Sequence, residues 1–163
     1  MHPEHIMVLG IGCTLFSDDG FGINVIQMLE QRYSFPDNVE IVDGGLLGVS
    51  LLGYISLPDH LIVIDTMCNN GNPGDIYRLD AAEIKQRLLT KNSVQQVEFL
   101  EAFAHLQALE KVPRTIMFAV EPDDYKTCSC ELTPIIALKV DTVIRMIVDE
   151  LKGLGVRADR KGA

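Results

Sequence analysis

Two adjacent carboxylates, Asp18 and Asp19, close a glycine-pivoted loop that opens at Gly10. The loop follows a short apolar strand predicted over Ile6–Leu9, and an amphipathic helix begins just after it. In α/β proteins the phosphate of a cofactor often binds at such a helix N-terminus, where backbone N–H groups point outward. Two carboxylates at that place would repel a phosphate and attract a cation. The loop therefore predicts a cation site.

The spacing of the glycines argues against a nucleotide site in the same loop. Gly10 and Gly12 match the start of a dinucleotide-binding loop, but Leu15 stands where the third glycine is needed. The chain also has no glycine-rich phosphate loop that ends in a lysine. We therefore do not expect this loop to bind a nucleotide.

Three acidic residues, Asp19, Asp43 and Asp65, follow three predicted strands. Ligands of open α/β sheets bind beyond the carboxyl ends of the strands. If the three strands are neighbours, the carboxylates would lie close together and could hold a divalent metal. Asp18 has a simpler explanation, because acidic residues are favoured in the first turn of a helix. Asp43 precedes Gly44-Gly45, where stabilisation of the turn by an Asx hydrogen bond is an equally good explanation.

Histidine, a common ligand of transition metals, is poorly placed in this chain. His2 and His5 belong to a terminal segment that we expect to be solvated. His60 opens a predicted strand, and the length of that strand places it about 16 Å from Asp65. His105 lies deep in a predicted helix, about 15 Å from its first turn. None of the four is an attractive metal ligand, and none lies near a plausible nucleophile.

The cysteines offer weaker candidates. Cys13 shares the loop of Asp19 and could present a thiolate to nickel or zinc, although a small buried cysteine at a strand exit is the commoner case. Cys128 and Cys130 are too closely spaced for a C-x₂-C zinc site, so we interpret them as loop thiols.

Apolar strand candidates alternate with helical patterns along the chain, which predicts a largely parallel sheet with helices on both faces. The predicted strands are Ile6–Leu9, Val39–Val42, Leu61–Ile64, Ile76–Leu79 and Thr115–Val120. The fourth strand alternates and follows a turn, as an edge strand does, and could run antiparallel. Helices are expected from Phe21, over 46–55, from the Ser93/Gln96 capping box and, as one long helix, after Thr133-Pro134. The fold class is therefore α/β: a three-layer α/β/α sandwich with a five-stranded, mostly parallel twisted sheet, in a single domain over 1–163, with a frayed tail from Gly153 onward.

Composition excludes some classes of function. The net charge is −9, whereas nucleic-acid binding needs an excess of lysine and arginine to displace counterions. No apolar run approaches the roughly 20 residues that a membrane span requires. The N-terminus has no signal-peptide pattern, so we expect a cytoplasmic protein.

Together, the motifs resemble those of the nickel–iron hydrogenase maturation endopeptidases along nearly the whole chain. Any one motif is weak, but their order and spacing are quite specific. The matching segments are Gly10–Gly12, Asp18–Gly22, Val42–Gly45, Asp59–Asp65, Asn72–Gly74, the Ser93 helix start, Glu121-Pro122 and Leu132–Pro134.

The resemblance implies a cytoplasmic protease that acts on the precursor of the hydrogenase large subunit. Such enzymes remove a short C-terminal extension after nickel has been loaded, and the nickel in the substrate is the recognition signal. The family supplies ligands from two acids and one histidine, and the acids correspond to Asp19 and Asp65. The Asp43-Gly44-Gly45 segment would shape the substrate cleft.

The resemblance is incomplete at two positions. The S-x-H-Q helix start of the family reads Ser93-Val94-Gln95-Gln96 here, so Gln95 occupies the place of the histidine ligand. An amide oxygen is a harder and weaker nickel ligand than imidazole. Cys13 stands where the family commonly has asparagine, and its thiolate could compensate. The chain is thus either a variant subgroup with altered metal contacts or a paralogue that binds the precursor but cleaves it poorly.

Two other functions remain open at this point. One is a non-catalytic assembly chaperone that binds the large subunit and senses nickel loading. The other is a small α/β protein that uses its acidic cleft for magnesium or another divalent metal.

Overall fold

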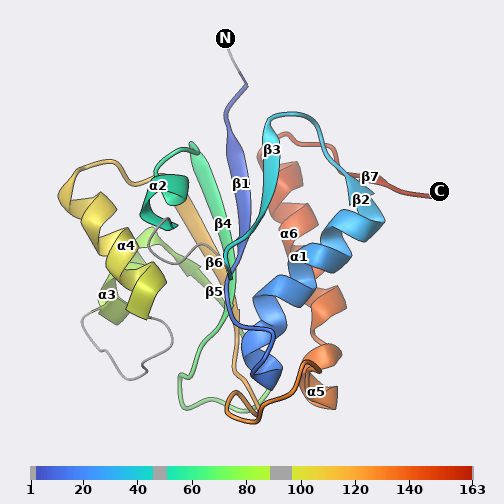
Figure 1. The fold of residues 1–163 in the computed structure, drawn as a ribbon. Helices are drawn as coiled ribbons and strands as arrows, with labels where there is room; N and C mark the ends of the chain where they lie inside the picture. The colour runs from blue at the N-terminus through green and yellow to red at the C-terminus, as the bar shows by residue number, and fades with distance from the viewer. Residues whose placement is uncertain (1–2, 46–50, 89–96, 163) are drawn as a thin grey trace.

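A single central sheet organises the computed structural model of the chain (Figure 1). The structure describes residues 3–45, 51–88 and 97–162. The strand order is β3-β1-β4-β6-β5, and all neighbours are parallel except β5, which pairs antiparallel with β6. The strands are Ile6–Gly10 (β1), Val39–Asp43 (β3), His60–Thr66 (β4), Ile76–Asp80 (β5) and Arg114–Val120 (β6). All five predicted strands and the antiparallel edge are confirmed.

Helices cover both faces of this sheet (Figure 1). One face carries α1 (Phe21–Arg32), α5 (Pro134–Ala137) and α6 (Val140–Gly153). The other carries α2 (Leu51–Ile55), α3 (Ala81–Leu88) and α4 (Val97–Ala108). The predicted three-layer α/β/α class is confirmed. Within the described part of the chain, no helix has the length and apolar character that crossing a membrane would take.

Alternation of side chains along each strand produces the two cores. On β1, Ile6 and Val8 pack toward α1 and α6, whereas Met7 and Leu9 pack toward α2 and α4. Every residue of β4 is buried, which explains its continuous apolar run.

The predicted helices need one correction and one addition. The long helix expected after Pro134 is interrupted at Leu138 and Lys139, where Lys139 N–H bonds to Ile136 three residues back and tightens the turn. Helix α3 was not predicted, although Asp80 and Glu83 form a reciprocal capping box at its start. The proposed capping box at Ser93 and the first half of the predicted 46–55 helix lie outside the described residues.

The prediction of a frayed tail is wrong. Residues Asp159–Arg160 (β7) pair antiparallel with Tyr33–Ser34 (β2) in a small separate sheet. Val156 is buried in the core beside α6, and Lys161 N–H donates to the carbonyl of Arg32. Burial of one apolar side chain and this backbone pairing hold the segment in place.

Backbone contacts at the carboxyl end of β1 bring α1 unusually close to the sheet. A Cβ at Gly10 would lie 2.6 Å from the carbonyl oxygen of Gly22, and a Cβ at Gly22 would overlap the carbonyl oxygens of Ile11 and Ile64. Gly12 has a φ of 132°, in the left-handed region, and its hydrogen faces the carbonyl of Asp19. These glycines allow the start of α1 to rest directly on the ends of β1 and β4.

We expect Gly22→Ala to destabilise the protein by several kcal/mol, because backbone atoms would have to move to admit the methyl group. Gly53→Ala is the matched control, since nothing lies within 4 Å of a Cβ there and alanine favours the helix. Urea denaturation of the two variants measures the difference. Equal stabilities would contradict the close-packing argument.

Candidate functional site

The carboxyl ends of β3, β1 and β4 lie side by side, as the acidic residues had suggested. Gly10, the last residue of β1, is in register with Asp43 on β3 and with Ile64 on β4. Asp65 is one residue further along β4. Asp19 reaches this edge from the single 3-10 turn that precedes α1.

Asp19 and Asp65 are brought together in the interior. Both are buried, with 8% and 4% of their surface exposed. The Thr66 side chain hydrogen-bonds to the carboxylate of Asp19, whose Oδ2 also accepts the backbone N–H of Cys13 at 3.0 Å. The Thr66 backbone N–H donates to Oδ1 of Asp65 at 2.7 Å. Thr66 therefore links the two acids.

The electrostatics of this pair favour a bound cation. Burial raises the pKa of Asp65 to about 8; the Thr66 N–H opposes the rise, and the nearby charge of Asp19 adds to it. Burial also raises the pKa of Asp19, against the hydrogen bonds from Cys13 and Thr66. A divalent cation would relieve both the desolvation and the repulsion of the two charges. The donor set, two carboxylates, fits such an ion.

Asp43 lies on the other side of β1 and is exposed. Its Oδ1 accepts the Gly45 N–H at 2.9 Å, so the Asx-turn explanation is confirmed. Gly44 N–H donates to the Gly10 carbonyl at 2.7 Å, which holds the turn against the end of β1. A role for Asp43-Gly44-Gly45 in contacting substrate stays a prediction.

The third expected metal contact, Gln95, lies outside the described residues. In the part of the chain that the structure describes, no three histidine, cysteine or acidic side chains group closely enough to hold a metal ion. Cys13 thus does not complete a three-residue site with Asp19 and Asp65 there, although its backbone contacts Asp19.

The described histidines lie away from the acid pair. His60 begins β4, is paired in register with Ile6 at the opposite end of β1, and contacts Oε2 of Glu4 at 2.7 Å. The Nδ1 atom of His105 contacts the carbonyl of Glu101 within α4. The inference that His60 stands at the wrong end of the sheet is confirmed.

Asp18 has a role that its position in the sequence did not reveal. Its side chain is fully buried and accepts the N–H groups of Asp123 and Asp124 on one oxygen and that of Thr133 on the other. The Thr133 hydroxyl also contacts both oxygens, at 3.0 and 2.9 Å. Asp18 therefore joins the β1–α1 loop to the loop before α5, which exceeds the first-turn role expected for it.

Glu121 is a second buried acid that the residue-by-residue reasoning missed. It accepts the Asn69 N–H and the Tyr77 hydroxyl, at 2.8 Å each for its Oε2. These bonds join Glu121, directly after β6, to the loop that follows β4 and to strand β5. The match of Glu121-Pro122 to the family motif was the available signal.

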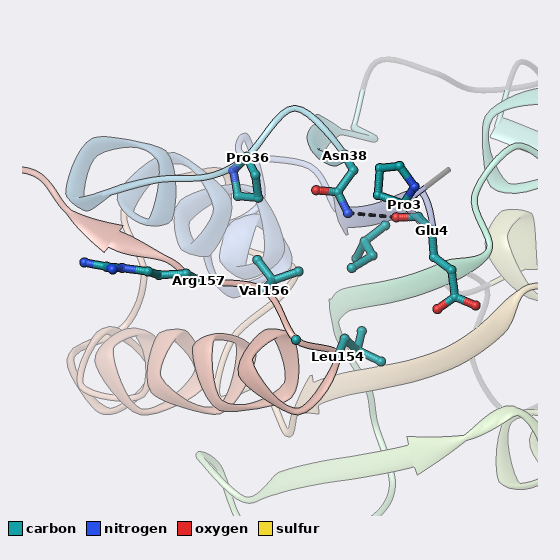
Figure 2. A pocket seen from close by; sticks show the side chains of 9 residues that line it. Pro3, Glu4, Pro36, Asn38, Leu154, Val156 and Arg157 are labelled. Atoms are coloured by element: carbon teal, nitrogen blue, oxygen red, sulfur yellow. Dashed lines mark hydrogen bonds between the residues drawn. The ribbon is translucent and has the colours of Figure 1, made fainter. Parts of the chain in front are cut away.

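The opposite edge of the sheet carries a pocket of about 480 Å³ (Figure 2). Its labelled side chains include Pro3, Leu154 and Val156, and an Asn38 amide that donates to the Glu4 carbonyl at 2.9 Å. This hydrogen bond holds the N-terminal segment against the turn that precedes β3. The pocket is separate from the acid pair, which lies at the carboxyl ends of the strands.

Asp65→Asn should stabilise the metal-free protein at pH 8 relative to the wild type. Because the folded state keeps the Asp65 proton up to about pH 8, whereas the unfolded state loses it near 4, wild-type stability falls as the pH rises between these values. This one group contributes at most about 1.4 kcal/mol per pH unit. Urea titrations at pH 5 and pH 8 measure the free energy of unfolding of both proteins. The difference between the variant and the wild type should be larger at pH 8. A difference that does not change with pH would contradict the argument.

Asp18→Asn should destabilise the protein by about 2 kcal/mol or more, because an amide cannot accept on both atoms and would leave buried donors unsatisfied. The matched control is Asp37→Asn at an exposed position, for which the change should lie within about 0.5 kcal/mol. Chemical denaturation at pH 7 compares the two. A similar loss in both variants would argue against the special place of Asp18.

Known proteins with similar sequences belong to one family. The family model described as hydrogenase maturation protease matches residues 23–150. The hydrogenase 2 maturation protease of Escherichia coli K12 is 32% identical over 155 residues, covering 94% of each chain. The hydrogenase expression/formation protein HupD of Bradyrhizobium diazoefficiens is 31% identical over 162 residues, covering 98% of this chain and 84% of its own length.

Solved structures of similar fold belong to the same family. The hydrogenase maturating endopeptidase HybD from E. coli superposes with a TM-score of 0.89 at 30% identity, covering 96% of this chain and 98% of that one. A hydrogenase 2 maturation peptidase from a Thaumarchaeota archaeon, at 24% identity and a TM-score of 0.68, shares the fold. The chain belongs to the hydrogenase maturation protease family, and it is an endopeptidase, a hydrolase of hydrogenase maturation.

Proposed function

We propose that this protein removes the C-terminal extension from the nickel-loaded precursor of a hydrogenase large subunit, in the cytoplasm. The nickel belongs to the substrate and is the signal that the precursor is ready for cleavage. The proposal rests on family membership and on one structural observation, the buried pair of Asp19 and Asp65 at the carboxyl edge of the sheet.

The acid pair suits recognition of a metal that arrives with another protein. Two carboxylates whose charged forms are opposed by burial gain most when a divalent cation enters between them. Precursor without nickel offers no such gain, so the same site discriminates against it. The ligands that we propose are Asp19 and Asp65, with Gln95 in the place of the family histidine.

Divalent nickel can act as a Lewis acid toward a carbonyl oxygen or a bound water. The residues of this chain would position the ion: Thr66 links both acids, and the Cys13 N–H orients Asp19. The Asp43-Gly44-Gly45 turn on the far side of β1, of which Asp43 and Gly45 are exposed, would border the path of the extension.

Asp19→Asn and Asp65→Asn should each reduce processing at least a hundredfold, because each removes one charged ligand of the nickel. The measurement is intact-mass analysis of nickel-loaded precursor after incubation with each variant. Glu40→Gln, an exposed change elsewhere on β3, is the control and should process at the wild-type rate.

Nickel-free precursor distinguishes the remaining possibilities. Loss of a C-terminal peptide only from loaded precursor supports the protease and means that Gln95 is tolerated. An unchanged mass with stable binding of loaded precursor would favour the assembly chaperone instead. Cleavage that follows magnesium rather than nickel would contradict nickel recognition.

A further inference from the structure

We propose that four exposed apolar side chains form the surface on which the large-subunit precursor docks. They are Leu15, Phe16, Ile135 and Leu138, which we call the apolar platform. This inference rests on the proposed function and adds the contact surface through which the substrate protein is held.

Exposure is high at all four positions of the platform. The exposed fractions are 56% for Leu15, 41% for Phe16, 41% for Ile135 and 76% for Leu138. Exposed leucine and phenylalanine are unremarkable singly, but these four stand on only two short segments. One segment is the β1–α1 loop, and the other is α5 with Leu138, the residue that follows it; both segments lie at the end of the sheet where the parallel strands terminate (Figure 1).

Hydrogen bonds fasten the two platform segments to each other. Leu15 accepts the Ser129 N–H at 3.0 Å, and the Ser17 hydroxyl donates to the Glu131 carbonyl at 3.1 Å. Asp18 then accepts the N–H of Thr133, the residue that directly precedes α5. These hydrogen bonds fix the backbone of both segments before a partner binds. Binding therefore costs little conformational entropy.

Ser17 shows that this arrangement is maintained against a local cost. Its φ is 49°, in the left-handed region, although it is not glycine. Such a conformation costs about 1–3 kcal/mol and persists only where surrounding contacts enforce it. Here the Ser17 N–H donates to Ser129 at 2.7 Å. The strained turn directly follows the exposed side chains of Leu15 and Phe16.

Continuity with the acid pair identifies the occupant. The Phe16 carbonyl accepts the Asp19 N–H at 3.1 Å, and the Cys13 N–H contacts the Asp19 carboxylate. A protein that delivers a metal to Asp19 must therefore lie over the loop between them. Stable protein contacts bury about 800 Å² on each partner around an apolar centre, which two carboxylates cannot provide. The platform supplies apolar surface beside them.

A second copy of this chain is a poorer occupant. Each copy carries a net charge of −9, and in the loop between β6 and α5 the exposed acids Asp123 and Glu131 outnumber the one exposed lysine, Lys126. A two-fold contact would place these carboxylates near their own copies and would cover Asp19 and Asp65. The proposal therefore commits to the large-subunit precursor.

The test compares two double variants with a matched control. Leu15→Ser with Phe16→Ser, and Ile135→Ser with Leu138→Ser, each remove half of the platform. The control is Leu57→Ser with Leu109→Ser, whose side chains are 64% and 62% exposed away from these segments. Thermal unfolding first confirms that all three remain folded, as their exposure leads us to expect.

Steady-state cleavage of nickel-loaded precursor then separates docking from chemistry. We expect each platform variant to raise KM at least tenfold with kcat changed less than threefold, and the control to match the wild type. A KM unchanged in both platform variants, with cleavage by the wild type intact, overturns the docking surface and leaves the proposed function standing. A loss confined to kcat also overturns it, since that pattern indicates damage to the acid pair.

Binding covers the case in which the wild type does not cleave. Equilibrium titration with the same loaded precursor should then show the platform variants binding at least tenfold more weakly than the control. If the wild type neither cleaves nor binds the precursor, both proposals fall. Sedimentation gives one further contrary outcome: a wild-type dimer that a platform variant converts to monomers, with KM unchanged, makes the platform a self-association surface.

Discussion

Direct contact between the backbones of β1 and α1 is the constraint on which the site depends. Gly10 ends the strand, Gly22 stands in the first turn of the helix, and neither has a side chain to separate them. The residues just before α1 are consequently pressed against the carboxyl ends of β1 and β4. Asp19 meets Asp65 through this contact. The two acids could not have produced it themselves, because burial disfavours their charged forms and those forms repel each other.

Burial of the acid pair lowers the stability of the protein locally, and packing in the rest of the fold offsets this loss. One hydrophobic core on each face of the sheet provides the burial of apolar surface that stabilises the fold. Within that frame, two carboxylates are placed where their charged forms are disfavoured. Sites arranged in this way give up stability in exchange for chemical reactivity or ligand binding. In the function proposed above, that ligand is the nickel of the precursor.

Neighbouring aspartates serve opposite purposes because their surroundings differ. Asp18 is surrounded by backbone N–H groups and the Thr133 hydroxyl, which satisfy its charge and make it a structural tie. Asp19 has fewer donors and a second acid beside it, which leaves it suited to a ligand. Asp18 and Asp19 are adjacent in sequence, so the hydrogen bonds of Asp18 also fix the β1–α1 loop relative to the acid pair.

Much of the architecture could be predicted from local sequence, because strand periodicity, turn residues and apolar runs are local signals. These signals predicted the five strands and the antiparallel edge strand. They also predicted that Asp19 and Asp65 follow strand ends and that His60 lies at the opposite end of the sheet from Asp65. Long-range hydrogen bonds and burial could not be read in this way. Only the tertiary structure decided that Asp18 bonds to Thr133, that Glu121 bonds to Asn69 and Tyr77, and that the tail pairs with Tyr33–Ser34. Each of these contacts depends on residues distant in sequence meeting in space.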